Sequence, residues 1–444
     1  MTRNVALVCP EPLRERVQGI GIRFLEMASC LARDHRVTLW APNEDIPPKY
    51  GNGIRPFDPN RFARDLSRQD IVIVQGHVSE MCFDLLDRVA PHARPAVVVD
   101  LYDPFLVENL HYASTLGERV FVRDRGILSR QLMRGDFFLT SSESQRLFYI
   151  GLLLGLGRLV PAVFHEDPTL RTWIEVVPFG VRPLNGEPNI SQPGRLKGVI
   201  PGIGPEDVVI FFGGVYDWYD PFTLVEAATP LVADGWPLRM VFCENPNRAV
   251  TPQHRLEQLR QWASLKGWTG RYVFFIPWFA YDKRFSFYRD VDVAVCLHRP
   301  SLETDLSLRT RLLDYMNAGI PMVVSEGGEG SRLVQQAGAG LLVKPADWIG
   351  TYRALNRLIS DQAFRRQCGE NGRQWVHQHM SWDRTLEPLQ AFCRNPVRWP
   401  MAEGLPYVSR RGLSAVWRRA VEYMRVHGVQ QTFRRIVRKM KVSR

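Results

Sequence analysis

The chain has 444 residues, 45% of them hydrophobic and 23% charged, which is typical of soluble globular proteins and excludes a disordered or fibrous chain. A length of ~150 residues per domain predicts two or three domains. The formal net charge of +11 lies almost wholly in residues 410–444, which hold eleven Lys or Arg and one acid, whereas the rest carries +1. Because nucleic-acid binding needs basic residues spread over a folded face, we expect no nucleic-acid partner.

The apolar segments and the cysteines indicate in which cellular compartment the protein is expected. No uncharged apolar run approaches the ~18–20 residues of a membrane-spanning helix, and residues 1–10 lack the pattern of a signal peptide. The seven cysteines are scattered, odd in number and without a C-x-x-C pair, which favours reduced thiols over disulfides or a zinc site. We therefore expect a cytoplasmic protein.

Short apolar runs separated by helix-length segments predict a first α/β domain over residues 1–183. The runs lie at 5–9, 37–41, 71–74, 96–99 and 137–140. Continuous apolar strands are typical of a parallel sheet that is covered on both faces by helices. After the first run, residues 19–23 (Gly-Ile-Gly-Ile-Arg) predict a glycine loop, and apolar spacing predicts a helix over residues 24–31.

The pattern then restarts in a second α/β domain over residues 206–380. Residues 184–205 are rich in Gly, Pro, Asn and Ser, which predicts a linker. The later runs lie at 208–212, 238–243, 273–276, 291–296, 321–324 and 340–343. Ligands of such sheets bind beyond the carboxyl ends of the strands, where both glycine loops fall. The sequence therefore predicts two doubly wound domains facing a shared cleft.

Residues 311–324 read RLLDYMNAGIPMVV and are followed by Ser-Glu-Gly-Gly at residues 325–328. These two segments resemble the donor-site helix, and the glycine turn after it, of GT-B fold glycosyltransferases, in particular family 4 (glycosyltransferase group 1). Further similar pieces occur in the family's order over roughly residues 1–394, namely Phe212-Gly213-Gly214 with residues 224–227, the interdomain segment 174–181, and Ser381-Trp382-Asp383.

The resemblance implies an architecture and an activity. The architecture is GT-B: an acceptor-side Rossmann-like domain (1–183), a linker (184–205), a nucleotide-sugar-binding Rossmann-like domain (206–380), a helix crossing back to the first domain (381–394) and a basic tail (395–444). The implied activity is glycosyl transfer, retaining and metal-independent, with a nucleotide sugar as co-substrate and no further cofactor.

The candidate donor site combines glycines, arginines and an acid. Backbone N–H groups of Gly213 and Gly214 and of a helix N-terminus suit a diphosphate. Ser307 is expected to N-cap a helix over residues 308–318, while Arg309 and Arg311 offer cationic forks for phosphate oxygens. The last candidate of this set is Asp314, which the resemblance places where family 4 enzymes carry the ribose-binding Glu.

The sequence departs from the family pattern at two points. The family's sugar-contacting glutamate falls on Leu306 here, and the nearest acids are Asp305 and Glu303, so the sugar contact stays open. The family's Arg and Lys after the glycine loop are replaced by residues 216–221 (YDWYDP), and we expect Arg309 or Arg311 to neutralise the diphosphate instead. Trp218 in that segment either stacks on the base or packs between the domains.

The candidate acceptor side lies in the first half. Gly19 and Gly21 resemble the family's glycine loop that faces the donor, although a plain turn explains them equally. His77, Asp100 and Asp103 follow strands, and one of them is expected to assist deprotonation of the acceptor. A structural histidine and an Asx turn are the alternatives for His77 and Asp103.

Two segments suggest a membrane surface. Residues 147–157 carry no charge and either form a buried helix or dock on a bilayer. In residues 410–444, apolar helical faces are flanked by Arg and Lys, the pattern of a helix that binds anionic lipids. We therefore expect peripheral attachment to the inner face of the cytoplasmic membrane and a lipid-linked or polysaccharide acceptor. A solvated tail, or one bound to a partner protein, is the alternative.

Two rival functions remain from the sequence. A GT-B nucleotide-sugar epimerase needs the same donor site but no separate acceptor. A catalytically inactive GT-B-like scaffold is the second rival, because the pair of acids typical of the family is broken here.

Overall fold

The computed structural model describes residues 1–76, 79–90, 93–112, 117–184, 194–244 and 253–399. Residues 1–399 form one compact unit. The candidate residue His77 and the basic tail 410–444 lie outside the described residues.

In the described part of the first half, seven parallel strands form one sheet in the order β3-β2-β1-β4-β5-β6-β7. The strands are β1 (Asn4–Val8), β2 (Arg36–Ala41), β3 (Ile54–Pro56), β4 (Ile71–Val74), β5 (Ala96–Asp100), β6 (Phe137–Thr140) and β7 (Ile174–Val176). The helices are α1 (Gly19–Leu31), η1 (Pro48–Tyr50), α2 (Pro59–Leu66), α3 (Ser79–Leu86), α4 (Phe105–Glu108), η4 (Asn109–Tyr112), α6 (Glu118–Arg134), α7 (Glu143–Gly155) and α8 (Pro161–Glu166).

The described part of the second half holds a sheet of six parallel strands, in the order β10-β9-β8-β11-β12-β13. They are β8 (Val208–Gly214), β9 (Leu238–Glu244), β10 (Val273–Pro277), β11 (Val293–Cys296), β12 (Met322–Ser325) and β13 (Gly340–Val343). The helices are α9 (Pro221–Ala233), α10 (His254–Leu265), η5 (Tyr281–Lys283), α11 (Arg284–Tyr288), α12 (Leu302–Leu306), α13 (Thr310–Asn317), α14 (Gly328–Ala337), α15 (Trp348–Ser360) and α16 (Gln362–His379), followed by α17 (Trp382–Thr385) and α18 (Glu387–Arg394).

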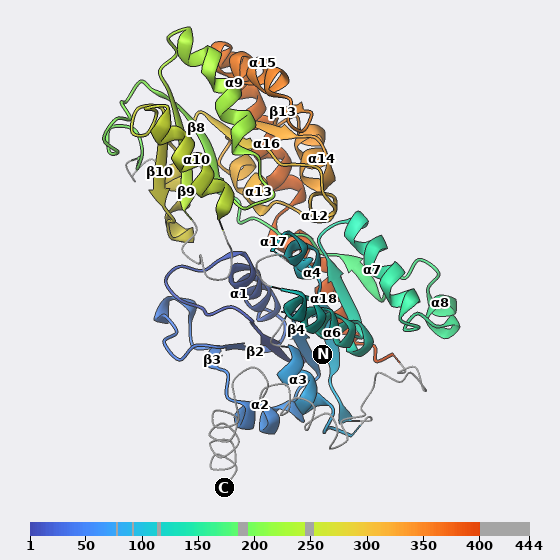
Figure 1. Cartoon of the computed structure of the whole chain (residues 1–444). Helices are drawn as coiled ribbons and strands as arrows, with labels where there is room; N and C mark the ends of the chain where they lie inside the picture. Colours follow the sequence, from blue (N-terminus) through green and yellow to red (C-terminus); the bar gives the residue numbers. More distant parts are fainter. Residues whose placement is uncertain (77–78, 91–92, 113–116, 185–193, 245–252, 400–444) are drawn as a thin grey trace, which may run out of the picture. The chain divides into compact units, whose positions relative to one another are not determined.

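Each sheet has helices packed against it, as Figure 1 shows, and the prediction of two doubly wound α/β domains is confirmed. The central strands are buried throughout, for example Ile71–Val74 and Ala96–Asp100, because helices cover both faces. The structure adds two strands that the sequence analysis did not predict as strands, β3 and β7.

The end of the chain's second half returns to the first sheet. Val181 forms a parallel bridge with Ser381, and the ring of Phe179 lies 4.6 Å from that of Trp382. Farther on, Phe392 of α18 stacks on Phe137 of β6 at 4.6 Å between ring centroids. Residues 381–394 therefore contact the N-terminal sheet and connect the two halves.

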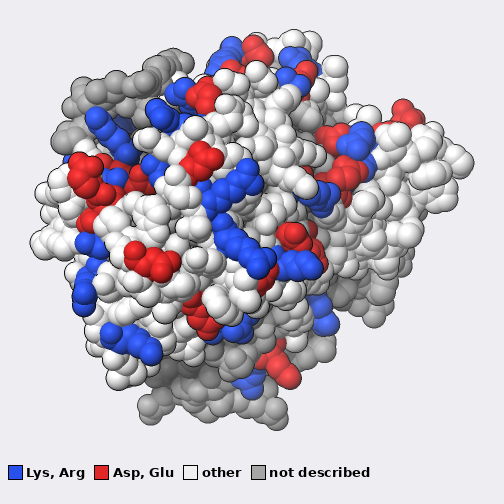
Figure 2. All heavy atoms as spheres, turned by 90° about the horizontal axis from the view of Figure 1, so that it is seen from above, with Lys and Arg blue, Asp and Glu red and all other residues white. Residues whose placement is uncertain are grey.

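Charges of both signs share the surface. On the face shown in Figure 2, Lys and Arg side chains lie among Asp and Glu side chains and do not cover the face. This agrees with the near-neutral sum outside residues 410–444. Within the described residues, none of the helices is both long enough and apolar enough to cross a bilayer.

Candidate functional site

The carboxyl end of β8 is shaped by two glycines. Gly213 has φ +76, and a Cβ there would lie 2.9 Å from the Tyr315 hydroxyl oxygen; a Cβ on Gly214 would lie 2.9 Å from the Trp278 ring. A side chain at either position would therefore strain the backbone or displace an aromatic ring. Both glycines are buried under the side chains of Tyr315, Trp278 and Arg311 at this strand end, where α/β sheets bind ligands.

Arg309 and Arg311 meet at one aromatic ring next to these glycines. The guanidinium carbons lie 5.3 Å and 4.5 Å from the centroid of Tyr219. Residues two apart on a regular helix point in different directions, but Arg309 is the N-cap of α13 and has extended backbone angles, whereas Arg311 is in the helix. The structure therefore brings together two cations that helical spacing alone would separate.

Each arginine has a partner within the protein. Arg311 donates from Nη1 to the carbonyl oxygens of Phe212 (3.2 Å) and Gly214 (2.7 Å), so it ties α13 to the glycine pair. Arg309 donates from both terminal nitrogens to the carboxylate of Glu303 on α12. The Glu303 side chain is 0% exposed and that of Arg309 is 9% exposed. Burial alone would raise the pKa of Glu303, but the charge and hydrogen bonds of Arg309 outweigh it and lower that pKa.

Asp314, the predicted ribose ligand, lies on α13 and is paired with Arg284. The Arg284 Nε donates to Asp314 Oδ1 at 3.0 Å, and the guanidinium also lies 3.5 Å from the centroid of the Tyr281 ring. Burial raises the pKa of Asp314, and the charge of Arg284 limits that rise. The Asp314 side chain keeps 18% of its surface exposed, so it borders the solvent.

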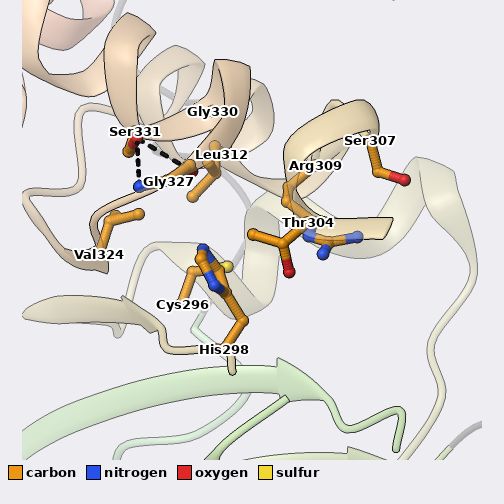
Figure 3. A pocket seen from close by; sticks show the side chains of 10 residues that line it. All are labelled: Cys296, His298, Thr304, Ser307, Arg309, Leu312, Val324, Gly327, Gly330 and Ser331. Atoms are coloured by element: carbon orange, nitrogen blue, oxygen red, sulfur yellow. Dashed lines mark hydrogen bonds between the residues drawn. The ribbon is translucent and has the colours of Figure 1, made fainter. Parts of the chain in front are cut away.

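A narrow cavity lies between Arg309 and the glycine turn before α14. It holds about 210 Å³ of space not filled by atoms, part of it open to solvent, and Figure 3 shows its lining: Cys296, His298, Thr304, Ser307, Arg309, Leu312, Val324, Gly327, Gly330 and Ser331. Burial, reinforced by the charge of Arg309, lowers the pKa of His298 to about 4. The imidazole is therefore neutral near pH 7 and offers both a donor and an acceptor.

Three carboxyl groups gather where the first half meets α12. Asp103 and Glu108 share a hydrogen bond, and both feel the charge of Glu303. Burial and the neighbouring acids Asp100 and Glu303 raise the pKa of Asp103 to about 6, although the hydrogen bond from Glu108 opposes this. Burial and the charge of Asp103 likewise raise the pKa of Glu108 well above its ordinary value.

Asp100 occupies a different environment from Asp103. Its carboxylate accepts from Arg23 Nε at 2.7 Å and Nη2 at 3.1 Å, and both side chains are 0% exposed. Arg23 also donates to the carbonyl oxygens of Val177 (2.8 Å) and Pro178 (3.1 Å). This ion pair ties β5 and α1 to the segment after β7, which is a structural arrangement.

The glycine loop predicted at residues 19–23 is wrong, because Gly19 and Gly21 lie in the first turn of α1. Glu11 folds back onto that turn: its carboxylate oxygens accept from the backbone N–H of Gln18 and of Gly21, each at 2.6 Å. A Cβ on Gly21 would collide with Val17. The donors that would bind an anion at this helix end are therefore occupied by the protein's own carboxylate.

Other predicted positions also changed. Ser307 does not N-cap the following helix; it is the C-cap of α12, and α13 starts at Thr310 without a side-chain cap. Trp218 is 7% exposed and stacks on Tyr216 with 5.1 Å between ring centroids, with His111 of the first half 5.6 Å away. It packs between the two halves and does not present a free face to a base. Asp305 is exposed on α12, beside the buried Glu303.

The sequence analysis missed several residues of this region: Glu11, Arg23, Glu108, Arg284 and His298. Of these only His298 carried a usable signal, because it follows the end of β11 as closely as other candidates follow their strands. The others act through partners distant in sequence, for example Arg23 with an acid 77 residues away.

Two parallel α/β sheets joined by a returning helix, with cations and glycines at a strand end of the second sheet, are the features of a GT-B glycosyltransferase. Comparison with known proteins agrees. Residues 206–361 match the family described as "Glycosyl transferases group 1". No curated protein sequence matches the chain significantly.

Solved structures match over most of the chain. Alr3699/HepE of Anabaena, in complex with UDP and glucose, is 12% identical with a TM-score of 0.64, covering 88% of this chain and 99% of its own. Sucrose-phosphate synthase of Thermosynechococcus elongatus is 13% identical (TM-score 0.56; 88% and 98%), and trehalose 6-phosphate synthase of Burkholderia multivorans is 14% identical (0.59; 89% and 96%).

The family match and the shared fold together identify the chain as a glycosyltransferase of GT-B type. The resemblance, the fold class and the enzyme class predicted from the sequence are thus confirmed. Assignment to family 4 in particular remains a prediction.

Proposed function

We propose that this glycosyltransferase moves a sugar from a nucleotide-sugar donor to a lipid-linked or polysaccharide acceptor at the inner face of the cytoplasmic membrane, with retention and without a metal ion. The observation that carries the donor part is the pair of guanidinium groups of Arg309 and Arg311 on one ring, next to Gly213 and Gly214 at the carboxyl end of β8. The likeness to a protein bound to UDP and glucose supports the same choice of donor.

In the proposed reaction the bond between the anomeric carbon and the diphosphate breaks, and its electron pair leaves with the diphosphate. A new bond forms to an acceptor oxygen, which loses its proton. The leaving group gains negative charge, so fixed cations stabilise the transition state more than the ground state. We assign Arg309 to the stabilisation of the leaving diphosphate. Its guanidinium could release the Glu303 carboxylate and bind the diphosphate while it stays against the ring of Tyr219.

The exchange also gives Glu303 a task. Once Arg309 binds the diphosphate, the Glu303 carboxylate becomes an acceptor for hydroxyl groups of the donor sugar, in place of the family's missing glutamate. Asp314 is assigned to the ribose hydroxyls, with Arg284 fixing its orientation. Asp103, whose pKa of about 6 leaves it mainly ionised at neutral pH, is the candidate for accepting the acceptor's proton.

A binding and turnover experiment tests this proposal. UDP-, GDP-, dTDP- and ADP-sugars are compared by thermal shift, since a ligand at 100 times its Kd stabilises the folded state by ~2.7 kcal/mol. Arg309→Ala is expected to weaken donor binding on the order of 10-fold and to slow transfer on the order of 100-fold. Arg353→Ala, an exposed arginine on α15, is the control and should change neither.

Three outcomes separate the alternatives. Release of free nucleoside diphosphate on transfer supports a transferase, whereas a change in the sugar without release indicates an epimerase. No shift with any donor would leave the inactive scaffold as the better reading. An Arg309→Ala variant with unchanged binding and turnover would remove the proposed donor site.

A further inference from the structure

Helix α7 is apolar on two opposite faces. Its inner face packs into the core through Tyr149 and Leu153, which are 1% and 0% exposed. Its outer face carries Leu147 and Leu154, which are 60% and 61% exposed and seven residues apart, with exposed Gly151 between them. Residues at this spacing lie on one side of a helix. A helix of a globular protein that is apolar on all sides needs a cover on its outer side.

Helix α8 follows α7 along the chain and carries a further exposed apolar residue, Phe164, which is 48% exposed. Between Leu147 and Phe164 the sequence contains one charged residue, Arg158. That side chain is 1% exposed: it donates to the carbonyl oxygen of Gly135 at 3.1 Å and lies over Trp173. The whole outer surface of this segment is therefore without charge. We call Leu147, Gly151, Leu154 and Phe164 the α7–α8 face.

The α7–α8 face begins at the junction of the two halves. The first turn of α7 contacts α12, and Ser144 accepts a hydrogen bond from Arg332 of α14 at 3.0 Å. On α12 itself, Leu302 is 50% exposed. Helix α7 thus contacts the element that carries Glu303, one of the acids near which we place the acceptor.

The described chain also ends near the base of α7. The backbone N–H of Trp399 donates to Asp136 at 3.0 Å, and Arg94 donates to the Trp399 carbonyl oxygen. Gly135, the neighbour of Asp136, is the residue that holds Arg158 after α7. In the sequence, residues 410–444, with a net charge of +10, begin eleven positions after Trp399.

We propose that the α7–α8 face inserts into the interfacial region of an anionic bilayer, with the basic tail supplying electrostatic attraction. Exposed aliphatic and aromatic side chains without charges suit the acyl boundary, and the Lys and Arg residues of the tail suit anionic head groups. A second copy of the chain is a poorer occupant, because the formal net charge of +11 on each copy opposes self-association. The inference rests on the proposed membrane acceptor and names the surface that would reach it.

Vesicle binding by the full-length protein tests the proposal. The double variant Leu147→Glu/Leu154→Glu keeps good helix formers at exposed positions, so the fold should persist. Flotation with vesicles of phosphatidylcholine containing one quarter phosphatidylglycerol should show binding weakened on the order of 100-fold, since each leucine contributes about 10-fold. Leu265→Glu is the matched control, because Leu265 is a leucine 89% exposed at the end of α10 in the other half; its binding should equal wild type.

Varying the salt concentration separates the contribution of the tail charge to vesicle binding from that of the α7–α8 face. Raising the salt concentration should weaken binding of the wild type through the tail charge, but the ratio between wild type and the double variant should persist. Donor thermal shift and donor hydrolysis in the absence of vesicles should be the same in all variants, so loss of the donor site is distinguishable from loss of membrane binding.

Two results would overturn the proposal. One is a double variant that floats with vesicles as well as the wild type does. The other is a wild type that is dimeric by light scattering and becomes monomeric in the double variant while vesicle binding is unchanged, which would assign the face to self-association.

Discussion

The buried ion pair of Arg23 and Asp100 allows a test of whether Asp100 stabilises the fold or acts in catalysis. The sequence nominates Asp100 as a candidate for acceptor deprotonation, whereas the structure places its carboxylate at 0% exposure under two hydrogen bonds from Arg23. The negative charge of Asp100 compensates the buried guanidinium of Arg23 and therefore stabilises the fold, whether or not Asp100 contacts a substrate. Asp100→Asn removes that charge and leaves the shape nearly unchanged.

The expected loss of stability follows from the burial. Removing one partner of a buried ion pair leaves an uncompensated charge and costs about 3–5 kcal/mol. Arg23 keeps its bonds to the carbonyl oxygens of Val177 and Pro178, which places the expected value at the lower end, ~3 kcal/mol. At roughly 2–4 °C per kcal/mol for a domain of this size, the melting temperature should fall by about 6–12 °C.

Thermal and urea denaturation measure the effect, with two comparison variants. Asp383→Asn breaks the exposed pair with Arg33, whose side chains are 59% and 62% exposed, and should change stability by less than ~1 kcal/mol. The double variant Arg23→Met/Asp100→Leu removes both buried charges and should recover much of the loss. An Asp100→Asn protein that melts within ~1 °C of wild type but has lost transfer would refute the structural interpretation.

Three further predictions concern residues of the candidate site. Glu303→Gln frees Arg309 from its ionic partner, so a nucleoside diphosphate should bind more tightly by calorimetry, on the order of 10-fold, while transfer slows; unchanged binding would contradict the exchange. Gly213→Ala forces a side chain into φ +76 against Tyr315 and should cost about 1–3 kcal/mol in a thermal melt; an equal melting temperature would contradict it. Asp103 has a folded pKa of about 6, above its ordinary value, so the stability it contributes is present below pH ~4 and lost as the pH rises through about 6. Asp103→Asn should therefore gain melting temperature relative to wild type at pH 8 and not at pH 4, and a gap independent of pH would contradict it.

The strands were predictable because both faces of each sheet are covered. A run such as Ile71–Val74 or Ala96–Asp100 is apolar at every position up to its end, and the structure reproduces these runs within a few residues. The strands β3 and β7 have three residues each, too few for a pattern, and Pro56 ends β3. The class of fold follows from the long strands, so these omissions did not affect it.

The grouping of the candidate residues at one strand end was predictable from the sequence, but their side-chain partners were not. Glycines and strand ends mark the carboxyl edge of a sheet from sequence alone, and Gly213, Gly214, Arg309 and Arg311 do meet there. Side-chain partners depend on packing between distant segments. Asp314 meets an arginine 30 residues before it, and no periodicity along the chain reports such a pair.

The Gly-x-Gly motif at the start of α1 is present as predicted from the sequence, but the structure does not support the role assigned to it. A Gly-x-Gly at the start of a helix offers free N–H donors, which is why it suggests an anion site. Here Glu11 supplies the anion from within the chain, at 2.6 Å from two backbone nitrogens. A carboxylate seven and ten residues upstream gives no sequence signal of this kind, so only the structure shows that the donors are occupied.

The partners of Arg309 and Arg311 differ in charge, and this difference is the reason that we assign the diphosphate of the donor to Arg309. Arg311 donates to two backbone carbonyls, which are neutral and cannot leave without breaking the end of β8. Arg309 is bound to a carboxylate, and Asp103 and Glu108 add negative potential around that carboxylate. An arriving diphosphate would therefore compete with Glu303 for Arg309, and its binding would replace one anionic partner with another. We therefore propose that Glu303 holds the Arg309 guanidinium charged and oriented until the diphosphate of the donor replaces it.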